Sequence, residues 1–369
     1  MPSVIHVVGA RPNFMKMAPL VRALWDEPAG YEHLLVHTGQ HYDEHLNDAI
    51  FRDLQLKAPD VHLGSGSGTH AEQTARIMLA FEAVVAQRRP SLVVVAGDVN
   101  STVACSLVAA KANVPVAHLE AGLRSFDWTM PEEINRVVTD RLTQLHLTPS
   151  ADADENLLRE GADPQGIVRV GNCMIDSLVD SLERAQAGSA LTRFGLDTGH
   201  FGLVTLHRPS NVDDKARLEQ FLRVLSEVAK RLPLVFPVHP RTRARIESLE
   251  LSPNALRESG VQLSEPLGYL DFLQLEAAAA VVITDSGGVQ EETTALGVPC
   301  LTVRDNTERP VTVTHGTNRV IGSNPSALPA ALDAIIGAAR KPTTRPELWD
   351  GKAGARAAKA ITSFLRARA

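Results

Sequence analysis

Short runs of apolar, often β-branched residues alternate with helix-length segments along the chain, and this alternation constrains the fold more than any other feature. The runs predicted as strands are residues 4–8, 34–38, 92–96, 114–119 and 144–148, then 203–206, 234–238, 261–263, 281–284 and 300–303. Runs such as LVVVA are apolar without a break, as strands covered on both faces require, so the sheets should be parallel. We therefore expect an α/β chain of two Rossmann-like, doubly wound domains that face a cleft.

The length of 369 residues also favours two domains over one. The first domain is predicted at 1–172 and the second at 173–351, with the boundary where the strand VRV ends near Gly171. The closing segment, 352–369, carries apolar residues on one helical face and is predicted to pack back on the first domain. Ligands of such folds bind beyond the carboxyl ends of the strands, so we expect the functional residues there.

Composition excludes several classes of partner and location. The net charge of −6 provides no basic field for nucleic acid or an anionic membrane. No apolar run of about 18 residues and no signal-peptide pattern appears, which predicts a cytoplasmic protein. Cys105, Cys173 and Cys300 lie far apart without a CxxC pair and are interpreted as buried, reduced thiols.

The first strand is followed by GARPNFMK, where Gly9 would permit a tight turn and Arg11 and Lys16 would flank the next helix. Two cations at a helix N-terminus suit a bound anion, although a solvated basic turn is the alternative. The chain lacks GxGxxG at this place and a P-loop, which argues against NAD(P) and ATP, and we expect no cofactor. His37, His41 and His45 imitate one helical face, but a strand and a glycine turn interrupt them, so no metal is expected.

Three carboxylates follow strands of the first half. Asp98 ends the third strand in GDVNST, where Ser101 or Thr102 could cap the next helix, or Asp98 itself could serve only as a cap. Glu120 ends the buried strand of HLEAGLRS, and a glutamate there costs free energy unless it is paired or used. Glu132 opens PEEINR, whose acidic residues also suit the first turn of a helix.

The second half places basic and small residues after its strands. His207 and Arg208 follow one strand in TLHRPSN, and His239 follows the next. The turn Ser286–Gly287–Gly288 opens a helix directly, so its amides could cradle a phosphate. Three further candidates are Phe272, which either stacks on a base or packs in the core, Glu292, which either binds ligand or compensates the helix dipole, and Arg309.

Taken in order, GARPNFMKMAP, TGQH, GDVNST, HLEAGLRS, PEEINR, TDSGGVQEE, ALGVP and RDNTERP resemble the non-hydrolysing UDP-N-acetylglucosamine 2-epimerase family. The resemblance implies a GT-B-like homodimer that interconverts UDP-GlcNAc and UDP-ManNAc without NAD or metal. It also implies a mechanism in which UDP leaves C1 as the C2 proton is removed. The bound 2-acetamidoglucal is then reprotonated on the other face, and UDP adds back.

The resemblance further implies roles for individual residues. The catalytic residues would be Asp98, Glu120, Glu132 and His207. The substrate-binding residues would be Arg11, Lys16, Phe272 against uracil, Ser286, Gly287, Gly288, Glu292 on the ribose hydroxyls, and Arg309. A candidate activator site for a second UDP-GlcNAc would use Gln40, His41, Arg208 and His239.

Two departures from the family pattern keep other functions open. The segment HRPSN lacks the acid of the common HRRE or HRxEN, and Val311 follows Pro310 where TERPE is common. An epimerase of a modified UDP-GlcNAc derivative is therefore one alternative. A GT-B glycosyltransferase is another, because the fold alone does not separate it from an epimerase. A hydrolysing epimerase and a non-catalytic sugar-nucleotide sensor are weaker alternatives.

Overall fold

The computed structural model describes residues 3–25, 30–39, 51, 53–238, 240–249, 253–336 and 345–368. The chain forms two compact units, which we call unit 1 (Met1–Asp180 with Glu347–Ala369) and unit 2 (Ser181–Pro346). These limits differ from the predicted 172 and 351, because residues on both sides of them bond within unit 1. Asp176 accepts the amides of Ala353 and Gly354 at 3.1 and 2.7 Å, and Ser177 Oγ donates to the Met15 carbonyl at 2.6 Å.

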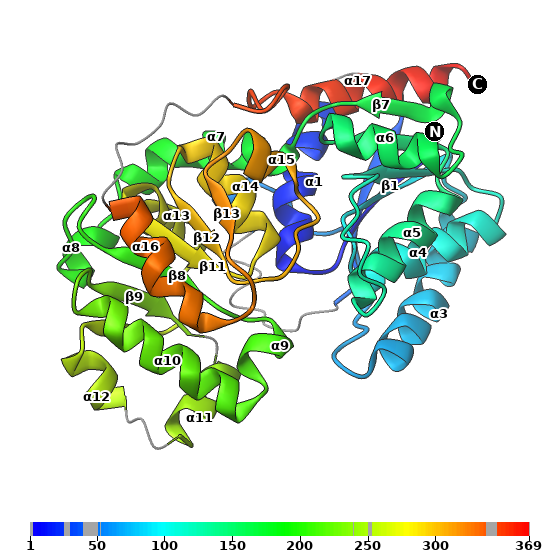
Figure 1. The fold of residues 1–369 in the computed structure, drawn as a ribbon. Helices are drawn as coiled ribbons and strands as arrows, with labels where there is room; N and C mark the ends of the chain where they lie inside the picture. The colour runs from blue at the N-terminus through cyan, green and yellow to red at the C-terminus, as the bar shows by residue number, and fades with distance from the viewer. Residues whose placement is uncertain are drawn as a thin grey trace. The chain divides into compact units, whose positions relative to one another are not determined.

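Unit 1 is built on a seven-stranded parallel sheet with the order β3-β2-β1-β4-β5-β6-β7 (Figure 1). Its strands are β1 (Ser3–Val8), β2 (Glu32–His37), β3 (Val61–His62), β4 (Leu92–Ala96), β5 (Val116–Leu119), β6 (Leu145–Thr148) and β7 (Ile167–Arg169). This is the Rossmann strand order, and the direction of strand succession reverses between β1 and β4. The fold class predicted from the sequence is confirmed for this unit.

Helices cover both faces of that sheet. The helices are α1 (Arg11–Trp25), α3 (His70–Arg88), α4 (Asn100–Lys111), α5 (Pro131–Leu142), α6 (Ala151–Arg159), η1 (Pro164–Gly166), α7 (Cys173–Gln186, which continues into unit 2) and α17 (Ala353–Arg366). On one face, Ile77 and Phe81 of α3 and Val108 of α4 join a core cluster with strand residues such as Ile5 and Val93. Helix α17 packs on α1, and the closing helix therefore belongs to unit 1 (Figure 1).

Unit 2 repeats the design with six parallel strands in the order β10-β9-β8-β11-β12-β13. The strands are β8 (Gly202–Thr205), β9 (Leu234–Pro237), β10 (Val261–Ser264), β11 (Val281–Thr284), β12 (Cys300–Thr302) and β13 (Asn318–Val320). Its helices are α8 (Ala190–Phe194), α9 (Pro209–Val212), α10 (Lys215–Ala229), α11 (Pro240–Glu247), α12 (Pro253–Glu258), α13 (Tyr269–Ala278), α14 (Gly287–Leu296), α15 (Val311–Thr314), η2 (Pro325–Ala327) and α16 (Leu328–Ile336). Two apolar clusters, one with α10 and α16 and the other with α13 and α14, bury the two faces of the sheet. Strand succession reverses between β8 and β11.

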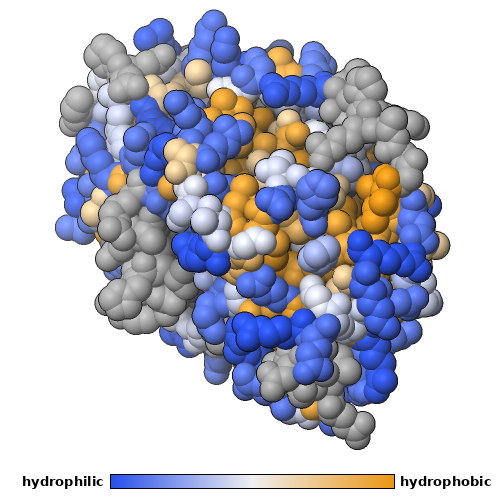
Figure 2. Space-filling view, turned by 90° about the vertical axis from the view of Figure 1, so that its left-hand side faces the viewer, coloured by the Kyte–Doolittle hydropathy of each residue, from blue (hydrophilic) through white to orange (hydrophobic). Residues whose placement is uncertain are grey.

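The molecular surface mixes apolar and polar side chains. On the face shown in Figure 2, hydrophobic residues gather in a central region and hydrophilic residues border them. Exposed apolar atoms are normal on a globular protein, so this pattern by itself marks no site. Among the described residues, every helix is too short or too polar to cross a bilayer.

Candidate functional site

Gly9 lies where the carboxyl end of β1 meets the start of α4. A Cβ atom at this position would lie 2.6 Å from Thr38 Oγ1 and would also overlap the Ser101 hydroxyl. The backbone of Gly9 is not left-handed, so the expected tight turn does not explain this glycine. Close approach explains it: Thr38 and Ser101 share a hydrogen bond of 2.7 Å directly beside its Cα.

Asp98 follows β4 and is held from α5. Arg136 donates to Asp98 Oδ2 through its Nε and Nη2, at 3.0 and 2.8 Å, and Asn135 donates to the Asp98 carbonyl at 2.9 Å. The residue that caps α4 is Val99, without a side-chain bond, so the predicted capping by Asp98, Ser101 or Thr102 is wrong. Both donors to Asp98 come from the motif PEEINR. That motif therefore orients the carboxylate of another motif, GDVNST.

Glu120 is the buried carboxylate that the sequence singled out, with 8 % of its surface exposed. Its φ of 71° is left-handed, a conformation that costs a glutamate of order 1 kcal/mol or more and is concentrated at functional sites. Lys16 Nζ donates to Glu120 Oε1 at 2.7 Å. Since β4 and β5 pair with Ala96 opposite Leu119, Asp98 and Glu120 follow neighbouring strand ends.

Lys16 and Arg11 differ in how far the structure describes them. Lys16 lies in the second turn of α1 instead of flanking its start, and 5 % of it is exposed. Its ammonium group lies beside Gly97, 2.8 Å from where a Cβ would be, and against Glu120. Lys16 was predicted to bind phosphate, and the structure shows that its ammonium group pairs with the Glu120 carboxylate. Arg11 opens α1, but its side chain lies outside the described part of the chain.

The two adjacent glutamates of PEEINR have different environments. Glu133 is buried and accepts the Ser125 amide and hydroxyl, both at 2.9 Å, and the Phe126 amide at 2.8 Å, and it pairs with Arg136. Its oxygens are thus saturated by structural donors. Glu132 is half-buried, and among the described residues its carboxylate makes no hydrogen bond or ion pair. Of the two, Glu132 is the one free to meet a substrate.

In unit 2, His207 and Asp285 form a pair across the point where strand succession reverses. Asp285 is fully buried after β11, and its Oδ1 lies 2.8 Å from Nδ1 of His207, which follows β8. Asp285 also accepts the Arg208 amide at 3.0 Å and Asn211 Nδ2 at 2.9 Å. Burial acts to raise the pKa of Asp285, but the His207 charge and these donors hold it below its ordinary value. The carboxylate therefore orients the His207 ring, whose side chain is 56 % exposed.

Asp285 is a functional residue that the sequence reasoning did not single out. The same signal that marked Glu120, an acid ending a buried apolar strand, is present in VVITD.

A cluster of arginines surrounds one buried carboxylate at the start of α14. Glu308 lies 2.7 Å from Arg304, 2.5 Å from Arg309 and 3.9 Å from Arg208. Arg309 also reaches Glu291 at 2.8 Å. These guanidinium groups add to the positive end of the helix dipole, so an anion is favoured here.

The DSGG turn differs in detail from the expected phosphate cradle. Ser286 is the residue before the first turn of α14, and its amide already donates to Thr284 Oγ1 at 2.9 Å. The amides of Gly287 and Gly288 lie in the first turn, where a helix leaves donors without an internal partner. A Cβ on Gly287 would lie 2.7 Å from Glu308 Oε1 and would overlap Arg309. The absence of a side chain at Gly287 thus leaves room for Arg309 at the start of α14.

The predicted nucleoside contacts lie on α13 and α14. Phe272 is half-buried and packs against the apolar cluster that includes Val289. Glu292 is buried and accepts the Tyr269 hydroxyl at 3.1 Å. Glu276 is fully buried, and burial together with the charge of Glu292 raises its pKa well above the ordinary value, so it is a neutral acid. The sequence analysis named neither Tyr269 nor Glu276.

With this geometry in place, the chain can be compared with known proteins. The family model described as UDP-N-acetylglucosamine 2-epimerase matches residues 23–362. The chain belongs to the UDP-N-acetylglucosamine 2-epimerase family. The resemblance noted from the motifs, and the isomerase class that it implied, are thereby confirmed.

Individual members of the UDP-N-acetylglucosamine 2-epimerase family match the chain over almost its full length. UDP-N-acetylglucosamine 2-epimerase of Methanocaldococcus jannaschii is 40 % identical over 96 % of this chain and 98 % of that protein. Its crystal structure in complex with UDP-GlcNAc and UDP has a TM-score of 0.91 and covers 98 % of this chain and 100 % of that chain. UDP-2,3-diacetamido-2,3-dideoxy-D-glucuronate 2-epimerase of Pseudomonas aeruginosa is 38 % identical, over 98 % and 99 % of the two chains. The relatives thus include epimerases named for two different sugars.

Other predictions about this 2-epimerase family member concern an activator and metals. Of the candidate activator residues, Gln40, His41 and His239 lie outside the described residues, whereas Arg208 joins the arginine cluster and donates to the Asp285 carbonyl at 3.1 Å. His37 bonds to His62 at 2.8 Å, but within the described ranges no three His, Cys, Asp or Glu side chains gather as metal ligands.

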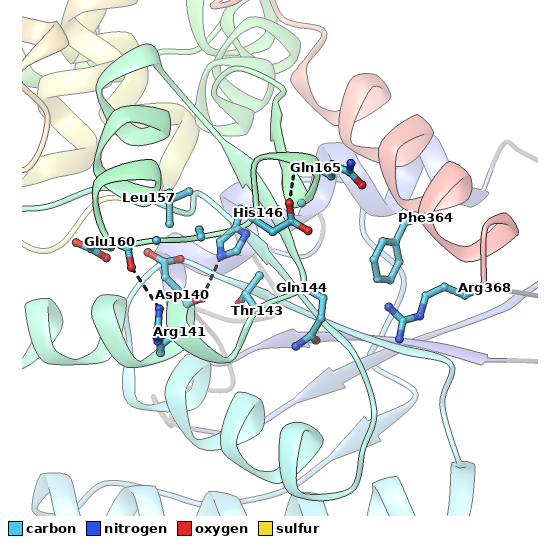
Figure 3. A pocket seen from close by; sticks show the side chains of 14 residues that line it. Asp140, Arg141, Thr143, Gln144, His146, Leu157, Glu160, Gln165, Phe364 and Arg368 are labelled. Atoms are coloured by element: carbon cyan, nitrogen blue, oxygen red, sulfur yellow. Dashed lines mark hydrogen bonds between the residues drawn. The ribbon is translucent and has the colours of Figure 1, made fainter.

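A cavity of about 470 Å³ in unit 1 is separate from all these residues. It lies at the amino end of β6, lined in part by Gln144, Phe364 and Arg368 (Figure 3). In a parallel sheet this is the edge opposite the one that carries Asp98 and Glu120. The cavity therefore contributes nothing to the candidate active site.

Proposed function

We propose that this protein catalyses the reversible C2 epimerisation of UDP-GlcNAc to UDP-ManNAc. The observation that carries the proposal is the placement of Asp98 and Glu120 on neighbouring strand ends of unit 1. Inversion at C2 needs groups that remove and deliver a proton on two faces of the sugar, whereas a glycosyltransferase typically needs one base. Family membership and the UDP-GlcNAc bound by the Methanocaldococcus relative support the same reaction.

Departure of UDP drives the chemistry in this proposal. A C2 proton beside an acetamido group is weakly acidic, so its removal is coupled to breaking the C1–O bond. The bonding electrons leave with UDP, the proton passes to a carboxylate, and a C1=C2 double bond forms. Return of a proton to the other face of C2 and attack of UDP on C1 complete the epimerisation.

Unit 2 provides the groups that stabilise the departing diphosphate. The groups proposed for this role supply hydrogen-bond donors and positive charge to the developing anionic oxygen. They are Arg304, Arg309, the first-turn amides of α14 and the His207 ring, which Asp285 orients. Glu292 and Phe272 are proposed to hold the ribose and the uracil. Their burial and half-burial on α13 and α14 support a fixed nucleoside site.

Unit 1 provides the proton-transfer groups. Lys16 donates to Glu120 Oε1 at 2.7 Å and so fixes the orientation of this carboxylate. Arg136 does the same for Asp98. Glu132, which makes no bond of its own among the described residues, completes the set on the first turn of α5.

A modified UDP-GlcNAc derivative is the second candidate substrate. The Pseudomonas relative, named for a diacetamido uronate, is nearly as similar to this chain as the Methanocaldococcus one. In the segment HRPSN, the side-chain amide of Asn211 donates a hydrogen bond to Asp285. The acidic residue that is common in the family at the position before this asparagine is absent, and Ser210 stands there.

Incubation with each UDP-sugar in D2O, followed by NMR, tests the proposal. We expect deuterium at C2 and formation of the C2 epimer from UDP-GlcNAc. Glu120→Gln should bind UDP as before but turn over about 100-fold more slowly, because the amide cannot transfer the proton. Glu155→Gln, an exposed change on α6, is the matched control. Epimerisation of the diacetamido uronate alone would favour the second candidate, and sugar transfer without C2 exchange would contradict both.

We also propose that the enzyme works as a cytoplasmic homodimer. Three buried, unpaired cysteines suit a reducing compartment. Leu79 on α3 is 71 % exposed and lies at an apolar groove with Met78, Val85 and Val108, which suits a covered face. Light scattering of the unmutated protein and of Leu79→Asp measures the association directly, and an unmutated monomer would contradict it.

A further inference from the structure

His118 is a fully buried histidine of β5 that hydrogen-bonds through both ring nitrogens. Its Nδ1 lies 2.6 Å from Asp140 Oδ1, and its Nε2 lies 2.8 Å from the Gly97 carbonyl oxygen. A carbonyl oxygen accepts but never donates, so Nε2 carries a proton. If Asp140 is ionised, Nδ1 must carry one as well.

Several groups keep Asp140 ionised. Its Oδ2 accepts Arg124 Nη1 at 2.7 Å and the Gly122 amide at 3.1 Å. Burial acts to raise the pKa of Asp140, but His118 and Arg124 outweigh it and hold the pKa at about 2. Because the carboxylate can only accept, both nitrogens of His118 donate and the ring is an imidazolium.

The charges around this ring are balanced within unit 1. Arg124 pairs with Glu160 through two hydrogen bonds of 2.8 and 2.7 Å as well as with Asp140. His146 lies opposite His118 in the register of β5 and β6, and its Nε2 lies 3.0 Å from the Asp140 carbonyl (Figure 3). Two cations, His118 and Arg124, thus face two anions, Asp140 and Glu160.

This network ends on the two turns that carry the candidate carboxylates. Gly97 directly precedes Asp98, and its own amide donates to the Leu119 carbonyl at 3.0 Å, one residue before Glu120. On the other side, Asp140 binds the Gly122 amide, two residues after Glu120. Glu120 has a left-handed backbone with φ of 71°, a conformation that costs free energy for a residue with a side chain, so its turn needs support from the surrounding structure.

We propose that His118 is a positioning residue whose imidazolium links the turn of Asp98 to the turn of Glu120 through its hydrogen bonds to the Gly97 carbonyl and to Asp140. This rests on the proposed function for its catalytic consequence. The ring touches neither substrate nor reacting atoms; it sets the separation of two carboxylates that must reach one carbon. A misplacement of about 1 Å in such a pair can lower a rate about 100-fold.

The protonation state is tested on the unmutated protein without substrate. Two-dimensional ¹H–¹⁵N NMR of ¹⁵N-histidine-labelled protein, assigned with the His118→Gln variant, reports each ring nitrogen. We expect both nitrogens of His118 to bear protons at pH 7. A nitrogen of His118 without a proton at pH 7 would overturn the imidazolium, whatever the enzyme's activity.

The positioning role is tested by kinetics of His118→Gln against a matched control, His146→Gln. The control removes the neighbouring buried histidine, which bonds to the backbone carbonyl of Asp140 and leaves the Asp140 carboxylate and its bond to His118 in place. Per folded molecule, we expect His118→Gln to lower kcat at least about tenfold with KM within about threefold, and His146→Gln to leave both within about threefold. Asp140→Asn, which removes the carboxylate that links His118 to the Gly122 amide, should change kcat and KM in the same way as His118→Gln.

The outcomes separate this inference from the function on which it rests. If His118→Gln and Asp140→Asn keep the unmutated kcat per folded molecule and lose only thermal stability, the positioning role is wrong while the epimerase proposal stands. If the unmutated protein epimerises no UDP-sugar, the proposed function fails, and the NMR result still decides whether His118 is an imidazolium.

Discussion

At the scale of single residues, the acidic side chains of unit 1 differ in how many hydrogen-bond donors their carboxylate oxygens accept. Glu133 and Asp140 each accept three or more donors, and both are buried. Glu120 has Lys16 as its ion-pair partner, and Glu132 binds no other described residue. A carboxylate whose oxygens are all held by fixed donors has no acceptor position left for a substrate. Hydrogen bonding thus separates Glu133 and Asp140, which have structural partners, from Glu132, whose carboxylate is open to a substrate.

His6 in β1 is expected to make unit 1 sensitive to acid. It is fully buried, and burial, with a smaller effect of His33, lowers its pKa to about 3. Below pH 6.5 the unfolded chain binds a proton here that the folded chain does not. The free energy of unfolding therefore falls with decreasing pH, by up to about 1.4 kcal/mol per pH unit, until the folded-state pKa near 3 is reached.

The measurement uses tryptophan fluorescence during urea unfolding. All three tryptophans, Trp25, Trp128 and Trp349, lie in unit 1, so the signal reports that unit alone. His6→Leu should remove about 2 kcal/mol of the decrease in unfolding free energy between pH 6.5 and pH 5. His70→Gln, which removes an exposed imidazole of the same unit, is the control. An identical pH dependence in His6→Leu and the unmutated protein would refute the assignment.

At the scale of elements, the start of α14 depends on a glycine that makes room for an arginine. Gly287→Val would put a branched side chain where Arg309 and Glu308 now lie. We expect the affinity for UDP to fall at least about tenfold, since the arginine and the first-turn amides would lose their arrangement around the phosphate. Calorimetric titration with UDP, together with a melting curve, measures the effect per folded molecule.

A double variant identifies the cause of that loss. If valine acts by displacing Arg309, then Gly287→Val should weaken UDP binding little in an Arg309→Ala background. Additive losses would instead mean that valine obstructs the phosphate directly. Unchanged UDP affinity in a well-folded Gly287→Val protein would contradict the phosphate site itself.

At the scale of the whole molecule, the chain returns to unit 1 after unit 2 is complete. The returning helix α17 packs closely on α1. A Cβ on Gly354 of α17 would lie 2.6 Å from the carbonyl carbon of Pro19 in α1. Gly354→Ala gains about 1 kcal/mol in helix propensity, but overpacking against a backbone costs about 1–3 kcal/mol. We therefore expect a net loss of stability of unit 1, seen as a lower urea midpoint by tryptophan fluorescence. Ala355→Leu, on the exposed side of α17, should change the midpoint little, and a stabilised Gly354→Ala would contradict the packing argument.

Much of the fold and part of the site follow from local sequence. Short apolar runs predicted ten strands at nearly their observed positions, because a buried strand leaves such a signature, and the predicted strand VRV corresponds to β7. Strands β3 and β13 were not predicted, since two or three residues carry too little pattern. Parallel strands end at one edge of a sheet, so the residues after β1, β4, β5, β8 and β11 could be assigned to the functional edge without coordinates.

Only the tertiary structure decided which of those residues pair and what each pair does. Lys16 and Glu120 are separated by 104 positions, and His207 and Asp285 by 78, so no local period connects them. The sequence could not show that the Ser286 amide donates to the Thr284 hydroxyl. It also could not show that Gly9 and Gly287 are needed because other side chains approach their backbones closely. It also did not reveal the imidazolium of His118, because a ring's protonation depends on both acceptors that folding brings to it. Secondary structure is encoded by neighbouring residues, whereas burial, charge pairing and proton occupancy are properties of the assembled core, and chemistry depends on the latter.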